Sequence, residues 1–147
     1  MKLDLEAKLL AHDIRPTAVR LLVLDALGHD NRAYSLSELE AKLGTVDKST
    51  IFRTLTLMWE QNVVHRIEDS QGQTRYAPCA EGCRCHDHHH EGLHDLHPHF
   101  ECERCGKVWC LRETELPEVQ LPEGFHLHTA AYVLRGLCPQ CERYCKN

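Results

Sequence analysis

Residues 1–78 of this 147-residue chain contain no cysteine, and no part of the chain has a long apolar run. A membrane-spanning helix needs about 18 or more consecutive apolar residues, so the sequence predicts no transmembrane segment. The N-terminus also lacks the apolar core of an export signal, because Asp4, Glu6 and Asp13 lie where that core would be. We therefore expect a cytoplasmic protein with no membrane partner.

An excess of basic residues is missing as well, since the formal net charge is −5. Residues 1–78 carry 10 Lys and Arg against 11 Asp and Glu, and residues 79–147 carry 7 against 11. A nucleic-acid-binding protein usually has a basic patch, so the net charge argues mildly against one and the local pattern must decide. Apolar residues at 42% and charged residues at 27% are typical of a folded protein and argue against a disordered or fibrous one.

Residues 79–147 hold all 9 cysteines and 9 of the 12 histidines. An odd number of cysteines in a chain without an export signal favours metal ligation over disulfides. The change in composition at Cys79 predicts a domain boundary. We expect a first domain at 1–78, a His/Cys-rich hinge and insertion at 79–96, and a second domain at 97–147.

The first domain is predicted to contain three helices followed by a β-hairpin. The first helix is predicted to begin at the proline-containing segment Arg15-Pro16-Thr17. The second begins at the capping box Ser35-x-x-Glu38, and the third at Asp47. Gly28 and Gly44 end the first two helices. The runs VVHRIE and TRYAPC flank Asp69-Ser-Gln-Gly72, which is a hairpin signal. Three helices followed by a hairpin is the order of a winged helix-turn-helix.

The third helix, KSTIFRTLTLMWEQ, is the candidate DNA-recognition helix. Its apolar side chains fall on one face, and Ser49, Arg53 and Thr56 fall on the other. Lys48, Ser49, Thr50 and Arg53 are donors suited to phosphates and guanine edges. The alternative interpretation of this polar face is a solvated surface with no ligand.

Two cysteine pairs, Cys102-x-x-Cys105 and Cys138-x-x-Cys141, are the most specific pattern in the chain. Four thiolates form a closed tetrahedral site for zinc, and the pairs predict a structural zinc site in a small α/β domain. A redox function would use a single such pair at a strand–helix junction. The spacing of His126 and His128 excludes a Cys-Cys-His-His zinc finger, and the proline after Cys138 argues against a nucleobase deaminase.

A second candidate metal site lies at the junction of the predicted domains. His97 and His99 are two residues apart on a predicted strand and therefore share a face. With His65 and Cys79, they form a set of three imidazoles and one thiolate. Residues 83–94, which lie between Cys79 and His97, are dense in His and Cys. This segment can alternatively be interpreted as a metal-scavenging loop.

The chain resembles the Fur family of metal-responsive repressors. The resemblance covers nearly the whole chain and rests on the order and spacing of five blocks, which are specific to that family: RPTAVRLLVLDAL, STIFRTL, VVHRIED, HPHFECERCGKVWCL and VLRGLCPQC. It implies an α+β homodimer with a winged-helix DNA-binding domain, a C-terminal dimerisation domain, and an operator on double-stranded DNA. It also implies Zn²⁺ at Cys102, Cys105, Cys138 and Cys141, and a sensory metal at His97 and His99. Phe52 and Arg53 stand where the family usually has a DNA-facing Tyr-Arg pair.

The departures from the family pattern bear on the metal. Cys79 stands where the iron sensors of the family have Glu and the peroxide sensors have Asp. In having a cysteine there, the chain resembles the zinc uptake regulators, which are the Zur-like members of the family. A thiolate favours Zn²⁺ over Fe²⁺. Pro117 and Pro122 also argue against the family's long C-terminal-domain helix.

We therefore predict a zinc-sensing, metal-dependent transcriptional repressor and not an enzyme. The alternatives within the family are an iron-, haem- or peroxide-responsive regulator, with Fe²⁺ as the other candidate sensory ion. Alternatives from other classes are a zinc hydrolase built on His65, Cys79 and His97, and a metal-storage protein built on residues 83–94. The hydrolase lacks a carboxylate base at diagnostic spacing, and neither alternative uses the winged helix.

Overall fold

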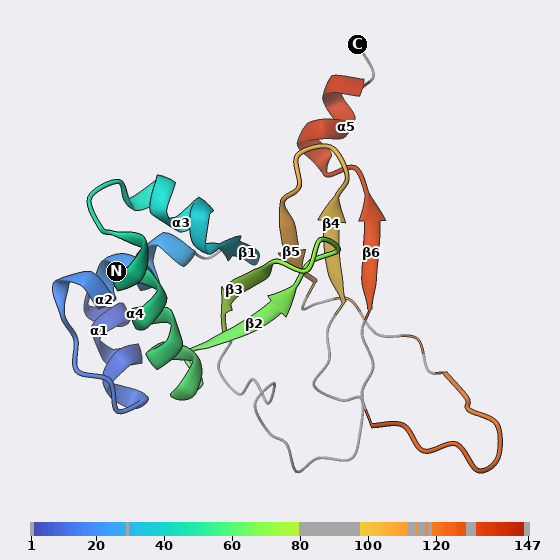
Figure 1. The fold of residues 1–147 in the computed structure, drawn as a ribbon, viewed down its shortest axis with the longest axis horizontal. Coiled ribbons are helices and arrows are strands. Elements are labelled where there is room, and N and C mark those ends of the chain that lie inside the picture. The colour runs from blue at the N-terminus through green and yellow to red at the C-terminus, as the bar shows by residue number, and fades with distance from the viewer. Residues whose placement is uncertain are drawn as a thin grey trace. The chain divides into compact units, whose positions relative to one another are not determined.

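A computed structural model describes residues 2–28, 30–79, 98–111, 114, 117, 119–128 and 132–145. The chain forms two compact units, Met1–Gly82 (the N-terminal unit) and Cys83–Asn147 (the C-terminal unit). Both combine helices with strands (Figure 1). The α+β class predicted from the sequence is confirmed.

The N-terminal unit has the winged helix-turn-helix order. Its elements are α1 (Lys2–Ala11), α2 (Ala18–Leu27), β1 (Arg32–Ser35), α3 (Leu36–Leu43), α4 (Lys48–Glu60), β2 (Val64–Glu68) and β3 (Thr74–Pro78). β2 and β3 form the predicted antiparallel hairpin, the wing, in which His65 lies opposite Ala77. β1 pairs with the other edge of β3 and is also antiparallel. The sequence did not predict α1 or β1.

The start of α2 differs from the prediction by a few residues. Thr17 is the N-cap, and its hydroxyl accepts a hydrogen bond from the Arg20 backbone N–H. Pro16 therefore precedes the cap instead of occupying the first helical turn. A side-chain acceptor at this position satisfies one of the unpaired N–H groups of the first turn. Gly28 ends the helix, as predicted, with φ of 69°.

The caps of α3 and α4 agree with the sequence. Ser35 accepts from the Glu38 N–H at 3.1 Å, and Asp47 accepts from the Thr50 N–H at 3.1 Å. Gly44 ends α3 with φ of 67°, a conformation that favours glycine. The two caps fix where α3 and α4 begin, and thereby which side chains stand at the start of the recognition helix.

The core of the N-terminal unit forms where the apolar face of α4 packs against α2, α3 and β2. Ile51, Leu55 and Met58 are fully buried, as the helical spacing predicts. Leu9 of α1 belongs to the same cluster. Within the described residues, no helix combines the length and apolar character needed to cross a membrane.

The C-terminal unit is a small sheet followed by a short helix. Its elements are β4 (His99–Cys102), β5 (Val108–Cys110), β6 (Val133–Gly136) and α5 (Pro139–Cys145). β4 is central, antiparallel to β5 and parallel to β6. The three strands correspond to the predicted runs, whereas α5 was not predicted. Residues 119–128 contain no helix, in agreement with the expectation from Pro117 and Pro122.

The apolar cluster of the C-terminal unit is built largely from cysteines. Cys102, Cys138 and Cys141 are buried, and Phe100, Trp109 and Leu137 pack against them. Phe100 and Trp109 face each other across β4 and β5, with ring centroids 6.3 Å apart. Among the described residues, this cluster has only a few apolar side chains besides its cysteines, and a small domain with so little core needs a metal or another cross-link.

Candidate metal centre and nucleic-acid interface

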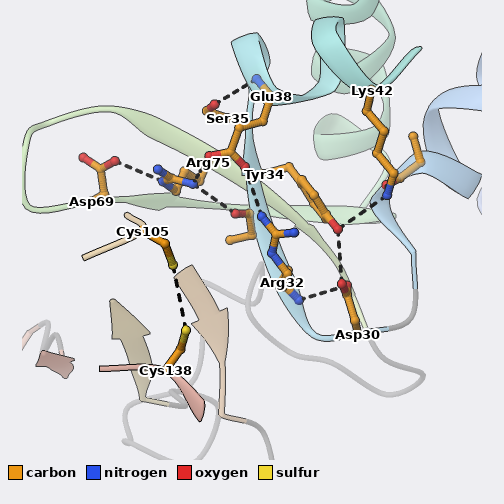
Figure 2. Close-up of polar contacts among 12 residues, drawn as sticks. Asp30, Arg32, Tyr34, Ser35, Glu38, Lys42, Asp69, Arg75, Cys105 and Cys138 are labelled. Atoms are coloured by element: carbon orange, nitrogen blue, oxygen red, sulfur yellow. Dashed lines mark hydrogen bonds and ion pairs between the residues drawn. The ribbon is translucent and has the colours of Figure 1, made fainter. Parts of the chain in front are cut away.

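The two predicted cysteine pairs come together in the C-terminal unit. The sulfurs of Cys102, Cys105, Cys138 and Cys141 all lie within 4.8 Å of one another. Figure 2 shows the Cys105 and Cys138 side chains facing each other, with the sulfurs 3.9 Å apart. Four sulfurs at this spacing surround a volume suited to one tetrahedral zinc ion, whose Zn–S bonds are about 2.3 Å.

Backbone turns hold the four thiols in place. Gly106 has φ of 72° and donates its N–H to the Cys102 carbonyl, so the chain reverses directly after the first pair. The Cys138 N–H points at the Cys102 sulfur at 3.4 Å, and the Cys141 N–H points at the Cys138 sulfur at 3.5 Å. These N–H groups would stabilise thiolates, which are the metal-binding form of cysteine.

The surroundings of the clustered thiols shift the pKa values of Cys102 and Cys141 in opposite directions. Burial opposes ionisation of Cys102, but the backbone N–H groups of Cys105, Cys138 and Arg104 outweigh it and lower the Cys102 pKa to about 6. Burial and the neighbouring thiols raise the Cys141 pKa to about 12. Four thiolates therefore require a cation to coexist. A metal ion bound by these thiols would displace their protons, so acid would weaken its binding.

The N-terminal unit holds two of the four predicted sensory residues, side by side. His65 lies in β2, Cys79 directly follows β3, and both are buried. The Cys79 sulfur is 3.7 Å from Nδ1 of His65. The backbone of Cys79 is fixed by its N–H to the Val63 carbonyl, and its own carbonyl accepts from Lys8 Nζ of α1 at 3.1 Å.

The other two predicted sensory residues belong to the C-terminal unit. His97 lies outside the described residues. His99 begins β4 and is paired directly with Cys110 of β5, and the ligand atoms of these two residues lie within 4.8 Å of each other. Cys110 is buried and was not assigned from the sequence. The available signal was its alternation with Val108, which places both residues on one face of the strand.

The predicted DNA-contacting residues occupy the N-terminal half of α4. Lys48, Ser49, Phe52 and Arg53 are exposed, and Phe52 is 50% exposed despite its apolar ring. Thr50 is half-buried; its hydroxyl donates to Asp47 at 2.6 Å and accepts from Arg53 at 3.4 Å. The hydrogen bonds from Thr50 also lower the Asp47 pKa, so this carboxylate is engaged with its own helix.

Comparison with protein families gives a match over most of the chain. Residues 11–131 match the Ferric uptake regulator family. The Ferric uptake regulation protein of Bacillus subtilis (strain 168) is 26% identical in an alignment of 131 positions, which covers 86% of this chain and 81% of that protein.

Solved structures share the fold at lower sequence identity. A zinc-bound manganese uptake regulator superposes with a TM-score of 0.63 at 19% identity, over 91% of this chain and 98% of the other. A zinc uptake regulator complexed with zinc and DNA superposes with a TM-score of 0.60 at 22% identity, over 99% and 95%.

Proposed function

Since this chain belongs to the Ferric uptake regulator family, whose members are metal-responsive transcriptional regulators and not enzymes, we propose that it is a Zur-like, zinc-sensing repressor. In this proposal the chain acts as a homodimer in the cytoplasm. It binds an operator on double-stranded DNA when its sensory site holds zinc, and releases the operator when zinc is lost.

The observation that carries this proposal is the Cys79–His65 pair, with sulfur and Nδ1 3.7 Å apart. The pair lies in the same unit as α4, so a metal ligand set and a DNA-reading helix share one folded body. A thiolate beside an imidazole favours zinc over the harder ferrous ion. A zinc uptake regulator solved with zinc and DNA and a zinc-bound manganese uptake regulator both share this fold, so the choice of zinc rests on the thiolate of Cys79.

We assign the sensory metal to His65, Cys79, His97 and His99, an assignment that rests on the sequence pattern and the family resemblance. Each unit contributes two of these ligands. Metal binding therefore links residues 1–78, the proposed DNA-binding domain, to residues 97–147, the proposed dimerisation domain, through the hinge at 79–96. Cys110 is a further candidate ligand because of its pairing with His99.

The second zinc site in this proposal is structural and is formed by Cys102, Cys105, Cys138 and Cys141. Its four sulfurs leave no position for a water or substrate once zinc is bound, which distinguishes a structural from a catalytic site.

The proposed DNA interface consists of Lys48, Ser49, Thr50, Phe52 and Arg53. A recognition helix contacts bases with its N-terminal residues, which is the part of α4 that these side chains occupy. Phe52 offers an apolar contact to a thymine methyl group. Because a two-fold dimer presents two such helices, the operator should be an inverted repeat.

Binding measurements across metals test the proposed function. The purified chain is titrated with zinc, ferrous iron and manganese, bound metal is counted per chain, and affinity is measured for promoter fragments containing inverted repeats. We expect zinc to switch on binding at the lowest free concentration. A switch driven by ferrous iron at lower free concentration would identify an iron regulator, and metal-independent DNA binding would contradict the sensory role.

Two α4 substitutions separate base reading from phosphate binding. Arg53→Ala should weaken operator binding by about 1–3 kcal/mol and relax sequence preference, because bidentate base contacts are lost. Lys48→Ala should weaken binding to DNA of every sequence alike. It should also reduce the slope of log K against log salt concentration by about 1. Fluorescence anisotropy on operator and scrambled duplexes at several salt concentrations measures both. Equal losses on both duplexes for Arg53→Ala would contradict base reading.

A further inference from the structure

One buried guanidinium in the N-terminal unit has acceptors on three different elements. Arg75 of β3 donates to the Asp69 carboxylate at the end of the wing, to the Glu38 carboxylate of α3, and to the Ala33 carbonyl of β1. Figure 2 shows Arg75 between Asp69 and Glu38. The three distances are 3.0, 2.7 and 3.3 Å, and the Arg75 side chain is 7% exposed.

At one end of this chain of contacts, Asp69 organises the wing loop. Its Oδ1 accepts the backbone N–H groups of Gln71 and Gln73, both at 2.9 Å, and its Oδ2 accepts from Arg75. The Asp69 side chain is 4% exposed, whereas the loop residues 70–73 are exposed. The loop therefore presents its backbone and polar side chains outward from a single buried carboxylate.

At the other end, Glu38 connects the same guanidinium to the helix-turn-helix. The Glu38 N–H donates to the α3 cap Ser35, and its second carboxylate oxygen accepts from Arg32 at 3.4 Å. The next contact leads to the recognition helix, because Lys48 at the start of α4 donates to Ser37 at 3.0 Å. Glu38 and Ser37 are neighbours in α3, so the wing loop is connected to α3 by the Arg75 ion pairs, and α3 to the start of α4 by the Lys48–Ser37 hydrogen bond.

The pKa shifts of Asp69 and Arg75 both favour the charged form, and each depends on the other group. Burial opposes ionisation of Asp69, but hydrogen bonds from the Gln73 N–H and Arg75 outweigh it and lower the Asp69 pKa. Burial likewise opposes the charge on Arg75, and its bonds to Asp69 and Glu38 raise the Arg75 pKa. Apolar residues of similar size often stabilise a fold as well as a buried ion pair does. Unlike apolar contacts, these ion pairs fix the orientation of Asp69 in the wing loop and of Glu38 in α3 relative to Arg75.

We propose that Arg75 is a positioning residue for DNA binding: it holds the wing loop, residues 69–73, at a fixed place relative to α3 and α4, so that the wing meets the phosphate backbone while α4 occupies the major groove. This inference rests on the proposed function. Backbone N–H groups and small polar side chains are common phosphate ligands, and the exposed wing loop supplies both. Phosphate contacts of this kind set the register of a protein on its duplex.

The test compares Arg75→Lys with Arg66→Lys in the zinc-loaded, full-length protein. Arg66 is the matched control, because it lies in the same hairpin but is exposed and stacks on Trp59, 3.5 Å from the ring centroid. Lysine keeps the charge at position 75 but cannot reproduce the forked geometry of the guanidinium. Hydroxyl-radical footprints report the wing contacts, and protection of guanines from methylation reports the contacts of α4.

We expect Arg75→Lys to lose the backbone protection at the wing while the guanine protection at α4 persists. Affinity should fall about tenfold, and each lost phosphate contact should reduce the salt slope by about 0.9. Arg66→Lys should leave both footprints unchanged. A purely structural role for Arg75 would instead reduce both kinds of protection in proportion to the loss of thermal stability, and that outcome would overturn the inference.

A second variant decides the question if Arg75→Lys does not fold. Glu38→Gln removes one charged partner of Arg75 at a position whose side chain is 32% exposed, so its cost in stability is smaller. We expect it to weaken the same wing protection. An unchanged footprint in Glu38→Gln would overturn the inference while leaving the repressor function intact. Failure of the native protein to bind any inverted repeat with any of the three metals would overturn both.

Discussion

Replacing Cys105 by serine is expected to abolish zinc binding at the four-cysteine site and to unfold the C-terminal unit. Cys105 is exposed, so the substitution removes a ligand without leaving a cavity. Zinc binding contributes about 10–16 kcal/mol to the folding of zinc-finger peptides, which matches or exceeds the about 5–15 kcal/mol that stabilises a whole domain. The few apolar side chains around Cys102, Cys138 and Cys141 cannot replace it.

Metal analysis, thermal unfolding and sedimentation measure this result. The expected outcome is one structural zinc lost per chain, loss of the C-terminal unfolding transition and dissociation of the dimer. Glu103→Ala is the matched control, since Glu103 is an exposed residue of the same turn and carries no thiol. A Cys105→Ser protein with native zinc content and an unchanged melting temperature would show that the site is not structural.

Replacing Cys79 by serine is expected to leave the fold, the dimer and the structural zinc intact but to abolish zinc-dependent operator binding. The thiol contacts His65 and is replaced by a hydroxyl, which is a poor zinc ligand. The remaining imidazoles would bind zinc too weakly for the sensory site to respond to the zinc concentration. Cys79→Asp should shift the preference towards manganese and ferrous iron, because carboxylate oxygen suits harder ions.

Thermodynamic linkage gives this experiment a second readout. If zinc tightens operator binding by a given factor, the operator must tighten zinc binding by the same factor, with a coupling of about 1–3 kcal/mol. In Cys79→Ser both factors should fall to one. The comparison variant is Cys83→Ser/Cys85→Ser, which alters the His/Cys-rich insertion. If that double variant lost the switch while Cys79→Ser kept it, the sensor would lie in the insertion.

Much of the fold could be predicted because its signals are local. Ser35 and Asp47 define the starts of α3 and α4, and Gly28 and Gly44 define the ends of α2 and α3, all through contacts within four residues. The Asp69–Gly72 signal defines the hairpin in the same way. The four-cysteine cluster was also predictable, because each Cys-x-x-Cys pair forms half of a site by itself.

The features that the sequence did not reveal depend on distant contacts. α1 has no cap signal in the sequence, and its Leu9 becomes informative only when buried in the core of the N-terminal unit. β1 is a four-residue strand defined by its pairing with β3. Glu38 looked like half of a capping box, yet its carboxylate binds Arg75, far away in the sequence. Cys110 acquires a possible role only because β5 lies opposite His99.

The parallel pairing of β4 with β6 has a consequence for how the C-terminal unit folds. Cys102 lies opposite Gly136, so two strands far apart in the sequence must meet before their ladder can form. Contacts of this kind are slow to form, because the entropy of closing the intervening loop is lost first. Zinc bound between Cys105 and Cys138 closes that same loop. Refolding followed by Trp109 fluorescence should therefore accelerate with zinc concentration, and a chain synthesised under zinc starvation should complete this unit late.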